Sequence, residues 1–393
     1  MTENRRAIIL LLDSVGCGAA PDAAQFGDEC SNTLGHICEK FENIQLPHLA
    51  KLGLGKILPL CNVEAPPQAM AAYGKMREIS LGKDTTCGHW EIAGTPVLKQ
   101  LPTYPRGFPP EVMDAFVKAA GCGYLGNEVA SGTEIIQRLG DEHCRTGKVI
   151  VYTSADSVFQ IAAHEEVVPL PRLYEICRQA RKILVGKHGV GRVIARPFVG
   201  TSGQYVRTAN RRDFSLPPPP GQLYANLQAA GVPTVAVGKI HDIFAEVGID
   251  FSYPTEDNAD GMKKTLAVLD RHPVGFIWTN FVDFDMQFGH RNNWQGYGQA
   301  LEALDAWLPR LLAKLRPADL LIITADHGND PTTPSTDHSR EYVPLLVYGP
   351  RMKGNVNLGI RRTFADVGAT VADYLGVAPV PAGVSFLSDI TKR

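Results

Sequence analysis

The sequence lacks the cysteine pattern of a disulfide-stabilised protein. Its eight cysteines form no CxxC pair and are scattered through the first half of the chain, at positions 17, 30, 38, 61, 87, 122, 144 and 177. A secreted disulfide framework is usually denser and belongs to a shorter chain. We therefore expect reduced thiols in a cytoplasmic protein.

Long hydrophobic runs are also missing near the N-terminus. The apolar stretch at residues 7–12 (AIILLL) is short and is followed directly by Asp13. It is too short for the core of a signal peptide or for a membrane span. We interpret it as a buried parallel strand that ends in a carboxylate, and we expect no membrane association.

An excess of charge of either sign is absent too. The formal net charge of −2 at pH 7 provides no electrostatic basis for binding nucleic acid or an anionic membrane. A small-molecule substrate fits better. With 44% hydrophobic and 20% charged residues, the 393-residue chain has an ordinary globular composition and is long enough for more than one domain.

The sequence does contain apolar segments that run into aspartate and histidine. These segments are residues 7–12, 275–281 and 320–324. The acidic and imidazole side chains that follow them are Asp13, Asp285, His290, Asp326, His327 and, further along, His338. Because ligands of open α/β sheets bind beyond the carboxyl ends of the strands, we expect these side chains to gather at one edge of a parallel sheet.

A mixed set of carboxylates and imidazoles suits Mn²⁺ or Zn²⁺, and Mg²⁺ when enough oxygen ligands are present. Six such side chains are enough for two cations, an arrangement that promotes in-line phosphoryl transfer. The alternative is that each residue only caps a helix or lies in a solvated loop. Asp283 competes with Asp285 for the ligand role, and Asp337 adjoins His338.

The middle of the chain has a different character. Residues 101–113 are rich in proline, and residues 215–222 contain four consecutive prolines, which suit a stiff, extended linker. We therefore predict an α/β core with a central, mostly parallel sheet flanked by helices, formed by residues 1–99 and 217–393. A smaller α+β domain, residues 100–216, is inserted between these two parts.

The segment GKDTTCGHWE at residues 82–91 contains two adjacent hydroxyl side chains, Thr85 and Thr86. A hydroxyl group close to two divalent cations has a lowered pKa and becomes a competent nucleophile. Spacing alone does not choose between the two threonines. Lys83 could bind a phosphate oxygen or be solvated, and Trp90 has no assigned role.

The chain resembles the prokaryotic phosphopentomutases of the alkaline phosphatase superfamily, which are relatives of the cofactor-independent phosphoglycerate mutases. The resemblance covers essentially the whole chain, and its most specific part is GKDTxxGHWE together with VDFDMxxGHR. It is carried by segments that include LLDSVGCGAAPDA (11–23), GKDTTCGHWEIAG (82–94), YTSADSVFQIAAHEE (152–166), NFVDFDMQFGHRN (280–292) and TADHGNDPTTPSTDHSREYVPLLVYGP (324–350).

The resemblance implies an alkaline phosphatase-like core and a role for each matched side chain. Thr85 corresponds to the nucleophile that carries the phosphoryl group. One cation corresponds to the ligands Asp13, Asp326 and His327, and the other to Asp285, His290 and His338. The usual ion of the family is Mn²⁺.

The implied activity is the interconversion of ribose 1-phosphate and ribose 5-phosphate, and of the 2-deoxy pair, in nucleoside salvage. It proceeds through a phosphothreonine and a sugar 1,5-bisphosphate, which also acts as activator, with the inserted domain as a lid over the site. The expected substrate-binding residues are Ser154 and Asp156 for the ribose, and Arg192, Arg207 and Lys239 for phosphate.

Two alternatives remain open at this stage. The first is another enzyme on the same scaffold, either a metal-dependent phosphatase or a phosphoglycerate mutase-like isomerase. The second is a non-catalytic metal-binding or sensor protein, which would be expected to lose the nucleophile or several ligands. All seven matched positions are intact in this chain.

Overall fold

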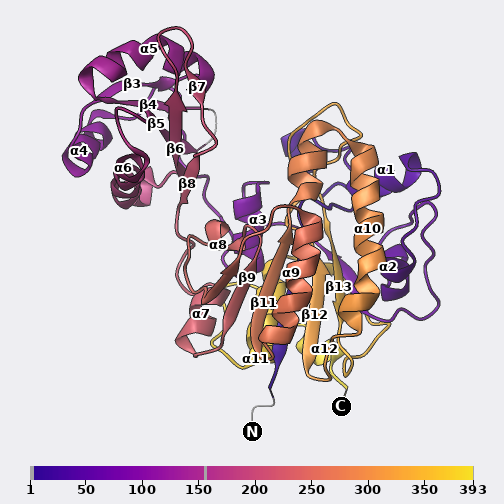
Figure 1. Ribbon diagram of the computed structural model, residues 1–393. Helices are drawn as coiled ribbons and strands as arrows, with labels where there is room; N and C mark the ends of the chain where they lie inside the picture. Colours follow the sequence, from indigo (N-terminus) through magenta and orange to yellow (C-terminus); the bar gives the residue numbers. More distant parts are fainter. Residues whose placement is uncertain (1–3, 155–156, 393) are drawn as a thin grey trace. The chain divides into compact units, whose positions relative to one another are not determined.

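The computed structural model describes residues 4–154 and 157–392. The chain divides into two compact units, of which the larger comprises Met1–Lys99 and Pro218–Arg393 and the smaller comprises Gln100–Pro217 (Figure 1). The second boundary between the units therefore falls inside the run of four prolines. The sequence predicts an inserted domain at residues 100–216, one residue short of this boundary.

The larger unit is built on an eight-stranded sheet. In spatial order its strands are β10 (Phe251–Tyr253), β9 (Thr234–Val237), β11 (Gly275–Phe281), β1 (Arg6–Leu12), β12 (Asp319–Thr324), β13 (Val343–Tyr348), β2 (Ala72–Met76) and β14 (Asn357–Arg361). The strands from β10 to β12 are parallel to one another, whereas β13 runs antiparallel to both of its neighbours. The predicted α/β fold with a mostly parallel central sheet is confirmed.

The three central strands explain why the sequence forms this sheet. Every residue of β1, β11 and β12 is buried, as expected for near-continuous apolar strands that are covered on both faces. Leu12 pairs with Phe281 of β11, and Leu11 pairs with Thr324 of β12, so the three strands end at the same level. The residues that follow each strand therefore emerge at one edge of the sheet.

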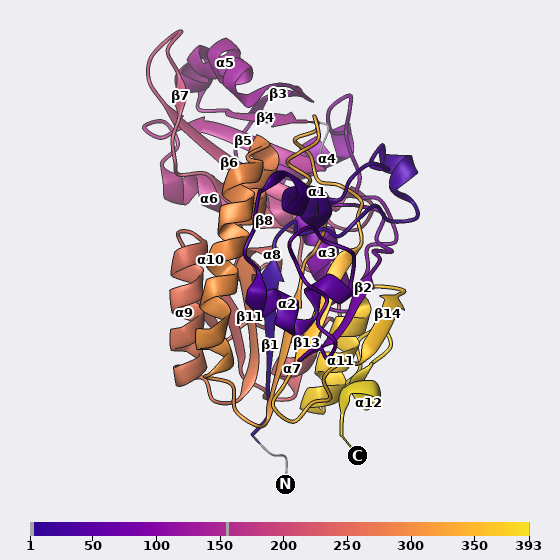
Figure 2. The same cartoon turned by 90° about the vertical axis from the view of Figure 1, so that its right-hand side faces the viewer.

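Helices cover both faces of this sheet. Figure 2 shows α9 (Asn258–Arg271) and α10 (Trp294–Leu312) on one side and α11 (Ala365–Leu375) on the other. The remaining helices of this unit are η1 (Ala23–Phe26), α1 (Thr33–Lys40), α2 (Pro47–Leu52), η2 (Leu54–Lys56), α3 (Thr85–Ile92), α7 (Leu223–Ala229), α8 (Ile240–Ile243), η4 (Phe284–Phe288), η5 (Gly289–Arg291) and α12 (Leu387–Ile390).

The smaller unit is an α+β sandwich around a mixed six-stranded sheet. Its strands are β3 (Tyr124–Val129), β4 (Val149–Thr153), β5 (Val158–His164), β6 (Arg192–Val199), β7 (Val206–Arg207) and β8 (Arg212–Ser215), and its helices are α4 (Pro110–Ala120), α5 (Gly132–Thr146), α6 (Leu170–Ile183) and η3 (Gly186–His188). Phe116 of α4 and Leu173 of α6 pack with Phe159 on one face of the sheet, and Ile135 of α5 packs with Ile150 on the other.

Within the described ranges, no helix combines the length and the apolar character needed to cross a membrane.

Candidate metal centre and nucleophile

The ends of β1 and β12 bring three of the predicted metal ligands together. One ligand atom from each of Asp13, Asp326 and His327 lies within 4.8 Å of the others. The Nε2 atom of His327 is 3.4 Å from a carboxylate oxygen of Asp13 and 3.4 Å from one of Asp326. All three side chains are buried, so this cluster forms a compact set of donors for one cation.

A second cluster lies directly beside the first. Its carboxylate is that of Asp285, on the short helix η4 that follows β11. Nε2 of His290 is 3.1 Å from one oxygen of Asp285, and Nε2 of His338 is 3.5 Å from the other. The ring of His338 also packs on that of His327 with centroids 4.0 Å apart, so the two clusters adjoin.

The electrostatics of the first cluster favour a bound positive charge. Burial and the neighbouring Asp326 carboxylate raise the pKa of Asp13, because two negative charges in a low-dielectric site repel each other. Burial alone would lower the pKa of His327, but the carboxylates of Asp326, Asp13 and Asp285 together raise it well above its ordinary value. Asp13 and His327 thus bind protons strongly, as expected of a site that accepts cations, whereas His327 and His89 outweigh the effect of burial and lower the pKa of Asp326.

Buried ligand atoms that lack a hydrogen-bond partner give a second test of whether cations fit this site. Oδ1 of Asp13 and Nε2 of His338 are buried without a hydrogen-bond partner among the described residues. Leaving such atoms unpaired in the interior costs free energy unless something else binds them. The donor set of carboxylate oxygens and imidazole nitrogens therefore fits divalent cations such as Mn²⁺ or Zn²⁺.

Each cluster has an asparagine that holds its central carboxylate. Nδ2 of Asn280 donates to Oδ2 of Asp13 at 2.9 Å, and Nδ2 of Asn329 donates to Oδ1 of Asp285 at 2.9 Å. Such partners orient metal ligands and tune their affinity. Our sequence analysis did not select either asparagine, although Asn280 lies within a predicted strand and Asn329 closes the motif Asp-His-Gly-Asn.

Thr85 is the first residue of helix α3. The carboxylate of Asp84 caps this helix by accepting the backbone N–H of Thr86 at 3.0 Å, which leaves the Thr85 side chain free of the cap. Oγ1 of Thr85 is 3.1 Å from Nε2 of His327. The Thr85 hydroxyl therefore faces the two clusters, and within the described structure no comparable contact is made by the hydroxyl of Thr86.

His89 links Thr85 to the first cluster. Its Nδ1 lies 2.8 Å from the carbonyl oxygen of Thr85 and 3.0 Å from Oδ2 of Asp326. Its ring is fully buried and stacks on Trp278 with centroids 5.5 Å apart. This histidine of the GHWE motif was not selected from the sequence, because it does not follow an apolar strand. It reaches Asp326 only in the folded chain.

The structure shows what Lys83 and Trp90, the two residues of the GKDTTCGHWE segment without an assigned role, contact. Nζ of Lys83 is 3.0 Å from Oδ2 of Asp28, so its charge is already paired by a carboxylate. Trp90 is buried, and its indole N–H donates to the carbonyl oxygen of Ile243 at 3.2 Å. Trp90 therefore packs α3 against the segment at the end of α8.

The two alternative carboxylates lie outside the clusters. Asp283 accepts the backbone N–H of Asn258 at 2.7 Å and thus holds the start of α9. Asp337 is 71% exposed and lies 3.8 Å from Nζ of Lys83. The geometry thus favours Asp285 over Asp283 and His338 over Asp337 as ligands.

Three of the predicted substrate-binding residues line one cavity of the smaller unit. This cavity has a volume of about 360 Å³ and lies on the face of the sheet that α5 covers. Ser154, Arg192 and Arg207 line it, together with Tyr152, Gln160, Arg196 and Arg211, which the sequence analysis did not select.

The remaining two predicted substrate-binding residues lie elsewhere. Lys239 belongs to the larger unit, where it is exposed at the start of α8 with its Nζ 3.6 Å from Sδ of Met286 on η4. Asp156 lies outside the described residues.

Comparison with known proteins supports the assignment of a family. A family model described as the Metalloenzyme superfamily matches residues 5–379. The phosphopentomutase of Caldanaerobacter subterraneus subsp. tengcongensis is 58% identical over 389 residues, which cover 99% of each chain. The phosphopentomutase of Carboxydothermus hydrogenoformans is 55% identical over 388 residues, which cover 99% of this chain and 100% of that protein.

A solved structure shows the same fold at much lower sequence identity. A protein of Pyrococcus horikoshii matches with a TM-score of 0.50 and 17% identity, over 95% of this chain and 98% of its own. That similarity supports the fold alone. The identity of more than half of all residues with curated relatives of full length shows that the chain belongs to the phosphopentomutase family of metalloenzymes, which are enzymes of the isomerase class.

Proposed function

We propose that this enzyme interconverts ribose 1-phosphate and ribose 5-phosphate, and the corresponding 2-deoxyribose phosphates, through a phosphothreonine formed on Thr85. The observation that carries the proposal is the position of the Thr85 hydroxyl, 3.1 Å from His327 and beside two adjoining clusters of carboxylates and imidazoles. Full-length identity to proteins named phosphopentomutase supports the choice of substrate.

In this proposal the two clusters hold two divalent cations. Asp13, Asp326 and His327 hold one, and Asp285, His290 and His338 hold the other, with Mn²⁺ as the expected ion. When bound, such cations neutralise the phosphoryl oxygens and lower the pKa of a nearby hydroxyl group. Nδ1 of His327 lies 3.0 Å from the carbonyl oxygen of Gly328 and donates to it, so the lone pair of Nε2 is left for the cation that the first cluster would hold beside Thr85.

The proposed reaction consists of two phosphoryl transfers. In the first, the free hydroxyl of the sugar monophosphate forms a bond to phosphorus, the bond to Oγ1 of Thr85 breaks, and the hydroxyl proton passes to the released Thr85 oxygen. In the second, Oγ1 of Thr85 attacks the other phosphate of the 1,5-bisphosphate and its proton passes to the released sugar oxygen. The bisphosphate therefore also restores the phosphoenzyme if the phosphate is lost to water.

The cavity of the smaller unit offers a binding site for the phosphate that does not react. Arg192 and Arg207 can grip a phosphate group with paired N–H donors, and Ser154 can bind a ribose hydroxyl. Arg196 increases the positive charge of the same cavity. Asp156 and Lys239 complete the proposed set of substrate-binding residues, and the smaller unit acts as the lid that keeps water from the phosphoenzyme.

The proposed setting is the cytoplasm, in the salvage of nucleosides. The eight cysteines are free thiols in the structure, which suits a reducing compartment.

Turnover of three substrates tests the proposed function. The enzyme loaded with Mn²⁺ and primed with ribose 1,5-bisphosphate is given ribose 5-phosphate, 3-phosphoglycerate or an aryl phosphate in separate assays. We expect ribose 1-phosphate from the first substrate with little release of inorganic phosphate. Cleavage of the aryl ester alone, with phosphate released to water, would show a phosphatase instead, and turnover of 3-phosphoglycerate alone would show a different mutase.

A further inference from the structure

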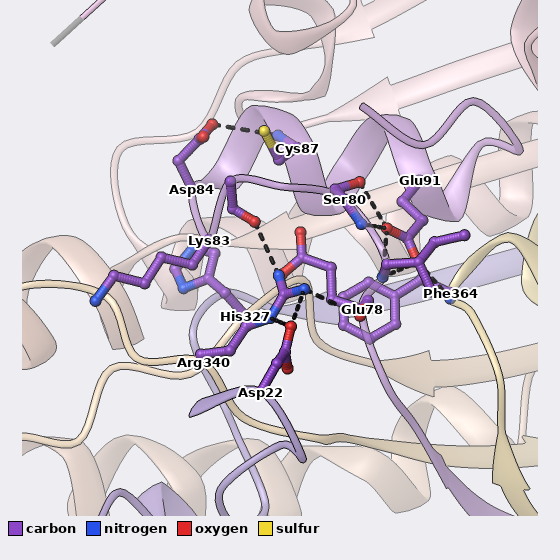
Figure 3. Close-up of polar contacts among 12 residues, drawn as sticks. Asp22, Glu78, Ser80, Lys83, Asp84, Cys87, Glu91, His327, Arg340 and Phe364 are labelled. Atoms are coloured by element: carbon purple, nitrogen blue, oxygen red, sulfur yellow. Dashed lines mark hydrogen bonds and ion pairs between the residues drawn. The ribbon is translucent and has the colours of Figure 1, made fainter. Parts of the chain in front are cut away.

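Arg340 is a buried arginine in the loop that carries His338. Its side chain is 3% exposed, and its guanidinium group donates to acceptors on three residues from two distant segments. Nη1 is 2.6 Å from Oε2 of Glu78 and 2.9 Å from the carbonyl oxygen of Gly82, and Nη2 is 2.9 Å from Oδ2 of Asp22 (Figure 3). A planar guanidinium can bind the acceptors on all three residues at once, which an ammonium group cannot do in the same geometry.

These contacts hold the segment that leads into the nucleophile. Gly82 and Lys83 directly precede Asp84, the cap of the helix that begins at Thr85. The backbone N–H of Arg340 donates to Oδ2 of Asp28 at 2.8 Å, and this same oxygen accepts Nζ of Lys83 at 3.0 Å. Both residues that precede the cap are thus tied to Arg340, one directly and one through Asp28.

The position of Gly82 leaves little freedom for this segment. A Cβ atom added at Gly82 would lie 2.5 Å from Sγ of Cys87 and 2.8 Å from Oδ2 of Asp84. The peptide therefore packs directly on the first turn of α3. A displacement of the Gly82 carbonyl would be transmitted to the cap and to Thr85.

The same loop is tied to the candidate metal ligands. Ser339 lies between His338 and Arg340, and it forms a two-way backbone bridge with Gly328, the residue after His327. The N–H of Ser339 donates to the carbonyl of Gly328 at 2.8 Å, and the reverse bond is 3.1 Å. Arg340 therefore joins the segment of the nucleophile to the loops of both clusters.

A different carboxylate holds the beginning of the nucleophile segment. Glu91 accepts the backbone N–H groups of Ile79, Ser80 and Phe364 at 3.0, 2.7 and 3.0 Å, as Figure 3 shows for Ser80 and Phe364. These bonds anchor residues 79 and 80 to α3 itself. Because Glu91 fixes the start of the segment, the contact between Arg340 and Gly82 controls its end.

We propose that Arg340 is a positioning residue, which holds the Thr85 hydroxyl at the distance from the two clusters that phosphoryl transfer requires. The inference rests on the proposed function, since it assigns the residue that orients the same nucleophile. It assigns Arg340 an effect on the rate of catalysis that is distinct from an effect on the stability of the fold. Loss of the guanidinium fork shifts Thr85 and slows transfer, whereas Asp13, Asp326 and His327 stay in place after strands that Arg340 does not touch. The backbone bridge between Ser339 and Gly328 keeps His338 in place.

The test compares Arg340→Lys with Arg6→Lys. Arg6 is an equally buried arginine whose Nε and Nη2 bind Asp319, at the opposite end of strand β1 from Asp13. The seven residues of that strand place Arg6 about 20 Å from the site. We measure kcat, KM for ribose 5-phosphate, the affinity for Mn²⁺ and the thermal midpoint of both variants.

For Arg340→Lys we expect kcat to fall by about 10²-fold, the effect of misplacing a reacting group by about 1 Å, with KM and the affinity for Mn²⁺ within about threefold of the native values. Arg6→Lys is expected to lower the thermal midpoint without such a fall in kcat. A native kcat in folded Arg340→Lys overturns the proposal, as does an equal fall of kcat in both variants.

Asp22→Asn keeps the test decisive if Arg340→Lys does not fold. Asp22 is 34% exposed, so this variant weakens the hold on the guanidinium without emptying the interior. We expect kcat to fall by about tenfold with KM unchanged, and a kcat within twofold of native overturns the proposal. If the native enzyme itself converts no pentose phosphate, the proposed function fails. The role of Arg340 is then decided by the rate at which a bisphosphate phosphorylates Thr85 in each variant.

Discussion

The hydroxyl groups of Thr85 and Thr86 differ in their surroundings, although the residues are adjacent. The Thr85 oxygen lies 3.1 Å from Nε2 of His327, whereas the backbone N–H of Thr86 serves the cap of helix α3. A nucleophile must lie beside the groups that activate it. The reactive threonine of the proposed mechanism is therefore Thr85.

Replacing Thr85 and Thr86 one at a time by alanine provides a matched test of this assignment. Thr85→Ala is expected to lower mutase activity by about 10³-fold or more, because no other hydroxyl group takes its place, with the affinity for Mn²⁺ largely unchanged. Thr86→Ala is expected to stay within about threefold of native. A coupled assay for ribose 5-phosphate and a titration with Mn²⁺ measure both effects. An active Thr85→Ala together with an inactive Thr86→Ala would reverse the assignment.

The sequence pattern located the side chains that the structure brings together beyond the strand ends, but it did not locate the residues that support them. Asp13 and Asp326 could be found because each comes directly after an apolar run whose end is recognisable. Arg340 could not be found in this way, since its acceptor Gly82 is 258 residues away in the chain. Asn280 was hidden for a different reason, because it lies inside a strand and reaches Asp13 only across the sheet.

Helix α3 is the element that brings the nucleophile to the two clusters. Its Gly88 packs against the end of β12, where an added Cβ would lie 2.1 Å from the carbonyl oxygen of Asp326 and 2.8 Å from Cβ of that residue. A side chain at position 88 must therefore push the helix away from the ligands. The segment contains no strong helical pattern, which explains why the sequence analysis described it as a motif and not as a helix.

Gly88→Ala should consequently impair catalysis more than an ordinary helical substitution. We expect kcat to fall by about 10²-fold because Thr85, one turn earlier, moves with the helix. Gly261→Ala in α9 is the matched control, since its Cβ would meet only side-chain carbons of Phe281 and Thr255, at 3.3 Å or more. Comparable kcat values for the two variants would show that α3 does not depend on this close approach.

In the smaller unit, helix α5 contains a buried histidine, His143, whose protonation state affects the stability of the fold. Nδ1 of His143 donates to the carbonyl of Lys148 at 2.7 Å, and Nε2 accepts the backbone N–H of His164 at 2.8 Å. Burial lowers the pKa of His143 below its ordinary value of 6.5. Protonation of Nε2 would break the second bond, so the folded state requires the neutral ring.

The sign of the pH effect follows from this lowered pKa. His143 contributes stability above the ordinary pKa of 6.5, and this contribution is lost as the pH falls below that value toward the pKa in the folded protein. Hydrogen exchange in α5, corrected for the pH dependence of the chemical step, should therefore speed up between pH 7 and about 5.5. His143→Gln should remove this pH dependence, and an unchanged dependence in the variant would assign it to another group.

For the whole molecule, the division into two units separates the candidate metal ligands from the arginine-lined cavity. All six proposed ligands belong to the larger unit, whereas Arg192 and Arg207 belong to residues 100–217. The proline run made this boundary visible in the sequence, because four prolines interrupt any helix or central strand. The order of strands in the sheet of the smaller unit was not predicted, since β7 and β8 are short and the sheet mixes parallel with antiparallel pairs.

Removal of divalent cations should therefore affect the two units differently. A ligand that binds only the folded state stabilises it by about 3 kcal/mol at 100 times its Kd. We expect a chelator to increase hydrogen exchange at the ends of β1, β11 and β12 and to leave residues 100–217 nearly unchanged. Restoration of Mn²⁺ should reverse the effect. Equal loss of protection in both units would contradict the placement of the cations in the larger one.

Mass spectrometry of the enzyme after incubation with ribose 1,5-bisphosphate and Mn²⁺ tests whether Thr85 carries the phosphoryl group during turnover. We expect an intact protein heavier by one phosphoryl group, a peptide that places this group on Thr85, and loss of the group when excess ribose 5-phosphate is added. A protein that stays unmodified, or one that carries the phosphate on a different residue while it interconverts pentose phosphates, would contradict this expectation.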